Sequence, residues 1–151
     1  MKTLRLLLIL LLPVVVLVGH PVVAASQGAS KDEAKAMAVS AADLVQKEGP
    51  DKAFAAFNAG GKWRDRDLYV FVFDKTGTWR ASGARPELIG TNDLNTPDSG
   101  GKLFVKDIVA INKGGWVDYK FKSPQDGQIH DKSSYFVRVG DFLVGVGAYK
   151  Y

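Results

Sequence analysis

Five side chains of types that bind small anions, and one tryptophan that could form a wall of a pocket, are spread along the chain. Lysine supplies a compact positive charge, arginine a planar fork of N–H donors, and tyrosine a hydroxyl on a ring that can line an apolar pocket. A charge-assisted hydrogen bond in a dry site is stronger than a neutral one, so one cation with two tyrosines is enough to bind a short carboxylate. The candidate ligand-binding residues are Tyr69, Arg80, Trp116, Tyr119, Lys132 and Tyr135.

Lys132 and Tyr135 lie three positions apart. Side chains alternate between the two faces of a regular strand, so this spacing would place the pair on opposite sides. Either Lys132 precedes the regular strand, or only one of the two reaches the pocket. Each candidate also has a structural interpretation: the aromatic rings can pack in a small core, and Lys132 and Arg80 can be solvated charges.

Enzymatic and metal chemistry have little support. His20 falls in the predicted export signal, which leaves His130, beside Asp131 in a polar loop, as the one histidine of the processed chain. The chain has no cysteine, no histidine cluster and no GxSxG motif, and residues 91–98 lack the glycine and final glutamate of a calcium loop. We therefore predict a protein that is not an enzyme, with no catalytic residue, no metal site and no cofactor.

The N-terminus has the pattern of a secretory signal peptide. Lys2 and Arg5 precede an almost wholly apolar run over residues 6–18, and small residues follow at positions 23–25. The apolar run is shorter than the roughly 20 residues that span a bilayer, so it is not expected to remain as an anchor. We predict a signal peptide over residues 1–25, cleaved after Ala25 or, alternatively, after Ala24.

Residues 26–151 are predicted to form one domain, located in the periplasm or secreted. Cleavage removes two basic residues and no acid, which lowers the formal net charge of +4 by two. The remaining charges are mixed and form no basic run, so nucleic acid is not an expected partner. No second apolar segment follows, so no membrane insertion is expected after cleavage, and without cysteine the fold depends on burial alone.

Periodicity and turn residues predict the elements that position the candidates. A capping box at residues 30–33 begins a long amphipathic helix that ends at Gly49-Pro50. The other predicted elements are a short helix at 51–58, strands at 68–73 and 78–81, a long loop at 82–100 with a helical turn near 86–88, helical spacing at 102–112, and strands at 116–122, 133–139 and 142–149. Gly145 and Gly147 share one face of the last strand, where a packed element or a ligand could approach the backbone.

This order predicts an α+β, PAS-like fold. A five-stranded antiparallel sheet would carry the long N-terminal helix on one face and the loop plus a short helix over the other. A small cavity is expected between the sheet and the loop.

Motifs along residues 31–151 together resemble the single Cache domain of the second type, an extracytoplasmic, PAS-like ligand-binding module. They are residues 69–74 with Gly77, residues 86–90, Asp98 with Gly101-Lys102, residues 115–119 with Phe121 and Pro124, residues 132–135 and residues 144–149. Such domains usually lie outside a membrane receptor, such as a chemoreceptor or a histidine kinase, and commonly bind small organic acids. The resemblance therefore implies a short carboxylate ligand and a membrane sensor as a partner.

Two departures from the family pattern matter. No transmembrane helix or signalling domain follows the domain in this sequence, so a freestanding secreted version is expected. Many members carry a His-Pro pair where this chain has residues 79–82, a position that often faces the ligand, so the resemblance does not identify the ligand.

Two functions remain open. One is a soluble extracytoplasmic small-molecule binding module in signal sensing. The alternative is a structural or interaction module without a ligand, which pairs with itself, for example as a homodimer through the N-terminal helix, or with another exported protein. Changes at Lys132, Tyr119 and Tyr135 would abolish ligand binding under the first and only perturb stability under the second.

Overall fold

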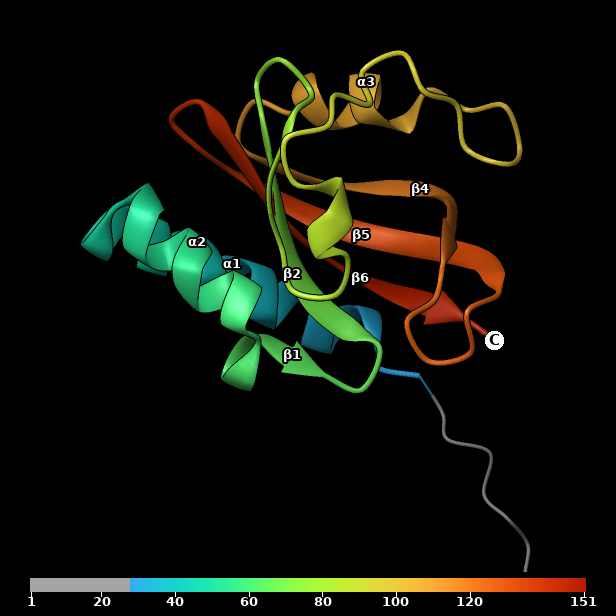
Figure 1. Cartoon of the computed structure of the whole chain (residues 1–151), viewed down its shortest axis with the longest axis horizontal. Coiled ribbons are helices and arrows are strands. Elements are labelled where there is room, and N and C mark those ends of the chain that lie inside the picture. The colour runs from blue at the N-terminus through green and yellow to red at the C-terminus, as the bar shows by residue number, and fades with distance from the viewer. Residues whose placement is uncertain (1–27) are drawn as a thin grey trace, which may run out of the picture.

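An antiparallel sheet separates two layers of helices and loops in the computed structural model, which describes residues 28–151 (Figure 1). The elements are α1 (Lys31–Glu48), α2 (Pro50–Ala59), η1 (Gly61–Trp63), β1 (Arg64–Asp65), β2 (Leu68–Asp74), β3 (Trp79–Ser82), η2 (Pro86–Leu88), α3 (Phe104–Val109), β4 (Gly114–Lys122), β5 (Ile129–Val139) and β6 (Phe142–Lys150). The predicted signal peptide, residues 1–25, lies outside the described residues.

The sheet has six strands. Five of them follow the order β1-β2-β6-β5-β4, and the sixth, β3, lies off this path and pairs with β2. The α+β, PAS-like arrangement is as predicted, but five strands were expected. The additional strand is β1, whose two residues pair with the start of β2 and are too short to show any periodicity. Because β6 pairs with β2, the last strand lies in the middle of the sheet beside the first long one.

The sheet is covered on both faces, so the described domain has two hydrophobic clusters. Alternate residues of β2 belong to different clusters: Leu68, Val70 and Val72 pack on the side of α1, and Tyr69, Phe71 and Phe73 pack on the other side. A strand buried on both faces reads as a continuous apolar run, and that is the sequence pattern of β2.

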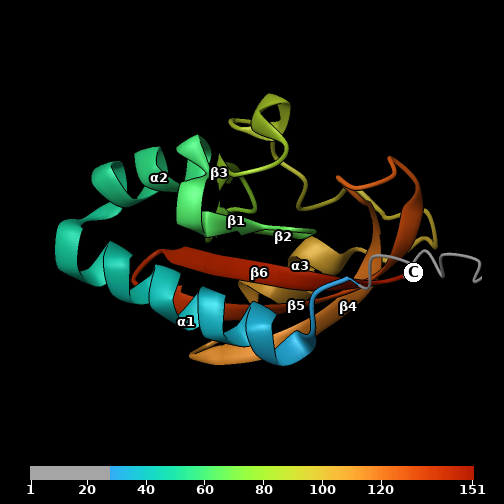
Figure 2. The same cartoon turned by 90° about the horizontal axis from the view of Figure 1, so that it is seen from below.

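Helix α1 runs along β5 and β6 (Figure 2). Its predicted capping box is confirmed: the Ser30 hydroxyl accepts the N–H of Glu33, and the Glu33 carboxylate accepts the N–H of Ser30 at 2.7 Å. Four buried alanines face the sheet and allow a close approach: Ala34, Ala38, Ala41 and Ala42. Helix α2 packs on the same side as α1.

The opposite face carries the long loop, as predicted. The short helix expected beside it, residues 51–58, is α2 and lies on the side of α1 instead, because its buried residues Ala53 and Phe57 pack in the α1 cluster. The helix on the loop side is α3.

The helical spacing predicted a helix over residues 102–112, yet α3 spans only Phe104–Val109. The later start of the helix arises at Asp98, whose carboxylate accepts the N–H groups of Gly100 and Lys102 and so holds this segment in a turn. Phe104, Val105 and Ile108 of α3 are buried against the sheet.

Strand β5 begins at Ile129, four positions before the predicted start at Ser133. The added residues pair regularly with both neighbours, and Lys132 lies opposite Tyr119 of β4 and Tyr149 of β6. Lys132 is therefore part of the regular strand. Within residues 28–151, no helix is long and apolar enough to cross a membrane.

Candidate functional site

Lys132 is buried in the layer between the sheet and the long loop, with 1% of its surface exposed. Its Nζ atom donates a hydrogen bond to the Tyr69 hydroxyl at 3.0 Å. Four aromatic rings surround this amine, with ring centres 4.2 to 5.4 Å from Nζ, and we call Lys132 with these rings the lysine cluster. The rings belong to Tyr69, Phe71, Phe121 and Tyr149.

The strand register brings the lysine cluster together. Lys132 is directly opposite Tyr119 and Tyr149 on its two neighbouring strands, so their side chains share one face. Tyr69 comes from β2, on the far side of β6. Ser134, two positions along β5, has its hydroxyl 2.9 Å from that of Tyr119.

Tyrosine hydroxyls line the polar side of the cluster. The hydroxyls of Tyr69 and Tyr149 lie 3.3 Å apart, and Tyr149 also donates to the carbonyl of Lys122 at 3.0 Å. Burial raises the pKa of Tyr69 to about 12 and that of Tyr119 well above its ordinary value. These hydroxyls therefore remain protonated at neutral pH and can act as hydrogen-bond donors.

No carboxylate within residues 28–151 forms an ion pair with Lys132, and its hydrogen-bond partner is the neutral Tyr69 hydroxyl. Burial lowers the pKa of the Lys132 amine well below 10.5, while the negative charge of Asp67 opposes this shift and the positive charge of Arg85 adds to it. Removing a cation from water without an anionic partner is costly. An anion that entered the cluster would supply the missing partner.

Asp67 binds the backbone near the C-terminal end of β6. This buried carboxylate accepts the N–H of Ala29 at 2.8 Å and that of Tyr149 at 3.4 Å. It thus joins the segment before α1 to the strand residue that supplies one ring of the lysine cluster. The carboxylate is bound to backbone groups and does not replace a partner for Lys132.

A cleft of about 300 Å³ lies beside the lysine cluster. It is formed by the segment around η2 and by the turn between β4 and β5, with these lining residues: Arg64, Ala84, Arg85, Glu87, Lys122, Ser123, Pro124 and Gly127. The Arg85 guanidinium lies 5.7 Å from the ring centre of Phe121, and Lys132 Nζ lies 5.4 Å from the same centre. Phe121 thus connects the cleft to the lysine cluster.

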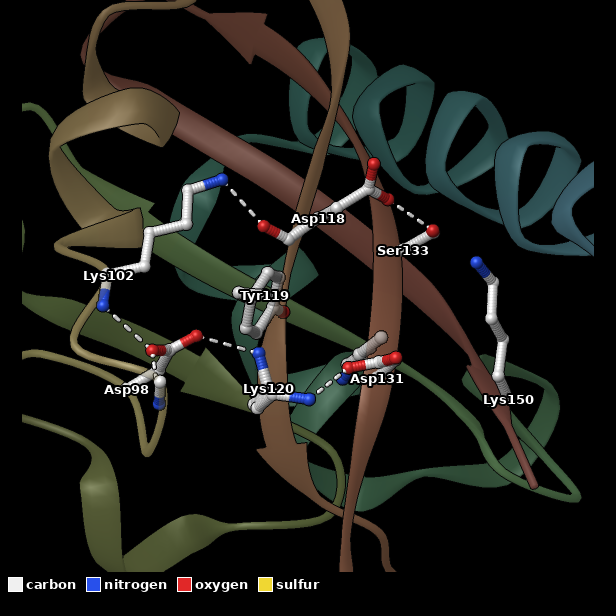
Figure 3. Close-up of a pocket in the computed structure, with 10 residues that line it drawn as sticks. Asp98, Lys102, Asp118, Tyr119, Lys120, Asp131, Ser133 and Lys150 are labelled. Atoms are coloured by element: carbon white, nitrogen blue, oxygen red, sulfur yellow. Dashed lines mark hydrogen bonds and ion pairs between the residues drawn. The ribbon is translucent and has the colours of Figure 1, made fainter.

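A second hollow, of about 370 Å³, is lined by Tyr119 and Lys132 together with polar residues beside them on the same strands (Figure 3). Here most charged groups already have a partner, whereas Lys150 has no ion pair within residues 28–151. Lys120 Nζ lies 2.5 Å from Asp131 Oδ1, and Ser133 donates to Asp118. These side chains alternate along β4 and β5 with Tyr119 and Lys132, which point to the opposite face. We therefore place the candidate site at the lysine cluster.

The structure brings three of the six predicted residues, Tyr69, Tyr119 and Lys132, to one face of the sheet. It does not bring Trp116 and Tyr135 to this face. Their rings pack together on the side of α1, with centres 5.2 Å apart. The reason is parity: because Lys132 lies in the regular strand, Tyr135 must point the other way.

On the side of α1, lysines cover the rings of Trp116 and Tyr135. Lys31 Nζ lies 4.3 Å from the ring centre of Trp116, and Lys35 Nζ lies 5.1 Å from that of Tyr135. Arg80 is also away from the cluster, exposed and 3.6 Å from the Asp74 carboxylate. These three residues do not lie at the lysine cluster, and their role as ligand contacts stays a prediction.

Sequence reasoning missed Tyr149, Phe121, Phe71 and Arg85. The first three had a usable signal, because each lies two positions from a residue already assigned to the same face: Gly147, Tyr119 and Tyr69. Arg85 had none, since it lies in a loop without periodicity. Its position depends on the Ser82 hydroxyl, which accepts the Arg85 N–H at 3.0 Å.

The family description that matches this chain is "Single Cache domain 2", over residues 19–150. The chain therefore belongs to this family, whose members are extracytoplasmic sensor domains that bind small-molecule ligands and couple to membrane sensors or receptors. The sensor histidine kinase MctS of Rhizobium johnstonii is 33% identical over 88 residues. That match covers 56% of this chain and only 19% of the kinase.

Solved structures of similar fold are sensor domains. A methyl-accepting chemotaxis protein from Vibrio parahaemolyticus has a TM-score of 0.69 at 21% identity, over 79% of this chain and 87% of that one. A periplasmic sensor domain of a chemotaxis protein gives 0.64 at 21% identity, over 80% and 90%. A Cache chemosensory domain described as recognising carboxylic acid gives 0.61 at 18% identity, over 80% and 88%. At these identities the likeness shows the fold alone.

Proposed function

We propose that this protein binds a small organic acid at the lysine cluster, outside the cytoplasm, and reports its occupancy to a membrane sensor. The observation that carries the proposal is a fully buried lysine whose hydrogen-bond partner is neutral. A carboxylate would provide the anion that this amine lacks and accept hydrogen bonds from protonated tyrosine hydroxyls. The carboxylic acid recognition described for a domain of similar fold agrees with this chemistry.

The surrounding rings limit the ligand to a short acid. Phe71, Phe121 and the rings of two tyrosines leave an apolar lining around the amine. In such a lining a charge-assisted hydrogen bond is poorly screened and contributes more than it would at the surface. An acid with a small carbon chain would satisfy the amine and keep apolar contact with the rings.

Thermal unfolding in the presence of short carboxylates, amino acids and amines tests the proposal. A ligand that binds only the folded state raises stability by RT ln(1 + [L]/Kd). We expect carboxylates to raise the Tm in a dose-dependent way and the Lys132→Met variant to lose the response. Lys113→Met, which removes an exposed lysine charge, serves as the matched control and should respond like the unchanged protein.

A flat response with well-folded protein would contradict carboxylate binding and favour the interaction module. Size measurements by light scattering would then show whether the protein forms a homodimer. Mass spectrometry of the protein purified after expression of the full chain tests the proposed cleavage after Ala25 or Ala24. Recovery of the processed protein from the periplasm or medium tests its proposed location.

A further inference from the structure

The cleft beside the lysine cluster is rich in positive charge. Three of its lining residues are basic, Arg64, Arg85 and Lys122, and one is acidic, Glu87. Lys132, which is buried 5.4 Å from the centre of the Phe121 ring, adds a fourth basic group near the cleft. Such an excess of one sign in a confined space attracts anions and favours ligands that carry more than one negative charge.

Arg85 is the basic residue of the cleft that is best placed to bind a ligand. Its side chain is 26% exposed, and its guanidinium carbon lies 5.7 Å from the centre of the Phe121 ring. The Nε atom donates to Glu87. Within residues 28–151 the two terminal Nη groups have no hydrogen-bond partner. Arg85 therefore offers free donors at the point where the cleft meets the lysine cluster.

Lys132 and Arg85 both lie near the ring of Phe121. Lys132 Nζ and the Arg85 guanidinium lie 5.4 and 5.7 Å from the centre of this ring. Lys132 is fully buried and has a compact point charge, whereas Arg85 is at the cleft and has a planar fork that suits both oxygens of a carboxylate. The two distances to one ring centre place Nζ and the guanidinium carbon at most about 11 Å apart, a span that the two carboxylates of one short molecule can bridge.

We propose that Arg85 forms a second anion subsite and that the preferred ligand is a short dicarboxylate, with one carboxylate at Lys132 and the other at Arg85. This inference rests on the proposed function, because it requires an acid at the lysine cluster. Glu87 orients the Arg85 guanidinium through Nε and leaves the terminal nitrogens to the ligand. Arg85 is therefore the specificity-determining residue, and Lys132 the residue required for any acid to bind.

Titration calorimetry with succinate and butyrate tests the second subsite. The two acids have the same carbon chain, and only succinate has a second carboxylate. A hydrogen bond to a charged group contributes about 1.5–3 kcal/mol, so succinate is expected to bind the unchanged protein at least roughly tenfold more tightly than butyrate. The Arg85→Gln variant should bind the two acids with similar affinity, while its affinity for butyrate stays close to that of the unchanged protein.

Three further variants separate the role of Arg85 from general charge and from folding. Lys113→Gln removes an exposed positive charge away from the cleft and should keep the preference for succinate. Glu87→Gln removes the carboxylate that orients the Arg85 fork, so a weaker preference for succinate is expected. Arg85→Lys retains the charge without the fork, so an intermediate preference is expected even if Arg85→Gln does not fold.

The outcomes distinguish this inference from the function on which it rests. Equal affinities of the unchanged protein for succinate and butyrate would overturn the second subsite and leave acid binding at Lys132 intact. An equal loss of both affinities in Arg85→Gln would also overturn it, because Arg85 would then act on any anion. If no carboxylate binds at all, the proposed function and the second subsite both fail.

Discussion

Gly147 lies directly against the side chain of Lys132: a Cβ atom on this glycine would lie 2.5 Å from Cε of the lysine. The same atom would lie 2.0 Å from the hydroxyl oxygen of Ser134. Both separations are too short for any side chain, so the space beside β6 that a residue at 147 would fill is occupied by the lysine stem and the serine. Gly147 thus helps to define the lysine cluster.

Replacement of Gly147 by alanine is expected to displace Lys132 and Ser134. Overpacking of a filled core costs about 1–3 kcal/mol, and a displaced amine would no longer be held at the rings and the Tyr69 hydroxyl. We therefore expect a lower Tm and weaker carboxylate binding. Gly115→Ala is the control, since its Cβ would make ordinary contact with Ile111 at 3.8 Å. Unchanged binding in Gly147→Ala would show that the glycine does not hold the lysine in place.

The buried amine predicts a pH dependence of stability. The pKa of Lys132 is lowered in the folded protein, mainly by burial, while the unfolded chain titrates near 10.5. Between these two values the unfolded chain binds more protons, so the free energy of unfolding rises with pH, by at most about 1.4 kcal/mol per pH unit. Denaturant unfolding between about pH 7 and pH 9, below the tyrosine titrations, measures this slope.

Lys132→Met is the comparison for that measurement. Methionine fills a similar volume without a charge, and replacing a buried charge by an apolar group is often neutral or stabilising. We expect the variant to be at least as stable as the unchanged protein at neutral pH and to lose the rise with pH. Identical slopes in the two proteins would mean that Lys132 is not the titrating group.

Carboxylate binding is expected to take up a proton. A carboxylate beside Lys132 favours the ammonium form and moves the pKa of the amine back toward its ordinary value. Above the pKa of the empty site, the complex therefore holds more protons than the free protein, and affinity falls as the pH rises. Calorimetry in two buffers of different ionisation enthalpy measures the proton number, and equal heats in both would argue against uptake.

The fold and part of the site followed from the sequence because they depend on local patterns. The capping box at Ser30, the apolar run of β2 and the alternation of β4 were visible in one dimension, and the structure agrees with each. The face of the sheet on which Lys132 lies depended on where β5 begins. The polar residues before Ser133 gave no strand pattern, although they pair regularly in the sheet.

The position of Arg85 and the late start of α3 could not be predicted for a different reason. Both depend on side chains that bind backbone groups of an irregular segment: Ser82 binds the N–H of Arg85, and Asp98 binds the N–H of Lys102. Such contacts have no periodicity, and their effect appears only when the loop is folded against the sheet. Loops of this kind commonly carry binding residues, and the cleft at Arg85 fits that pattern.

Asp98 also protects the free edge of the sheet, and this leads to the last prediction. Strand β4 ends the strand order, so one row of its backbone groups has no neighbouring strand. The Asp98 carboxylate accepts the N–H of Lys120 at 2.8 Å, and Lys102 Nζ donates to the carbonyl of Asp118 at 2.6 Å (Figure 3). The loop thus occupies edge groups that could otherwise pair with another chain.

Asp98→Ala should therefore lower stability and increase self-association. The variant loses bonds to three backbone N–H groups, and at a net value of about 1 kcal/mol each the expected loss is about 1–3 kcal/mol. The control is Asp107→Ala, which removes one exposed ion pair with Lys102, worth about 0–1 kcal/mol. Denaturant unfolding and sedimentation measure the two effects. If the variant is destabilised but stays monomeric, Asp98 stabilises the loop. That result would contradict the proposal that Asp98 prevents pairing at the edge of β4.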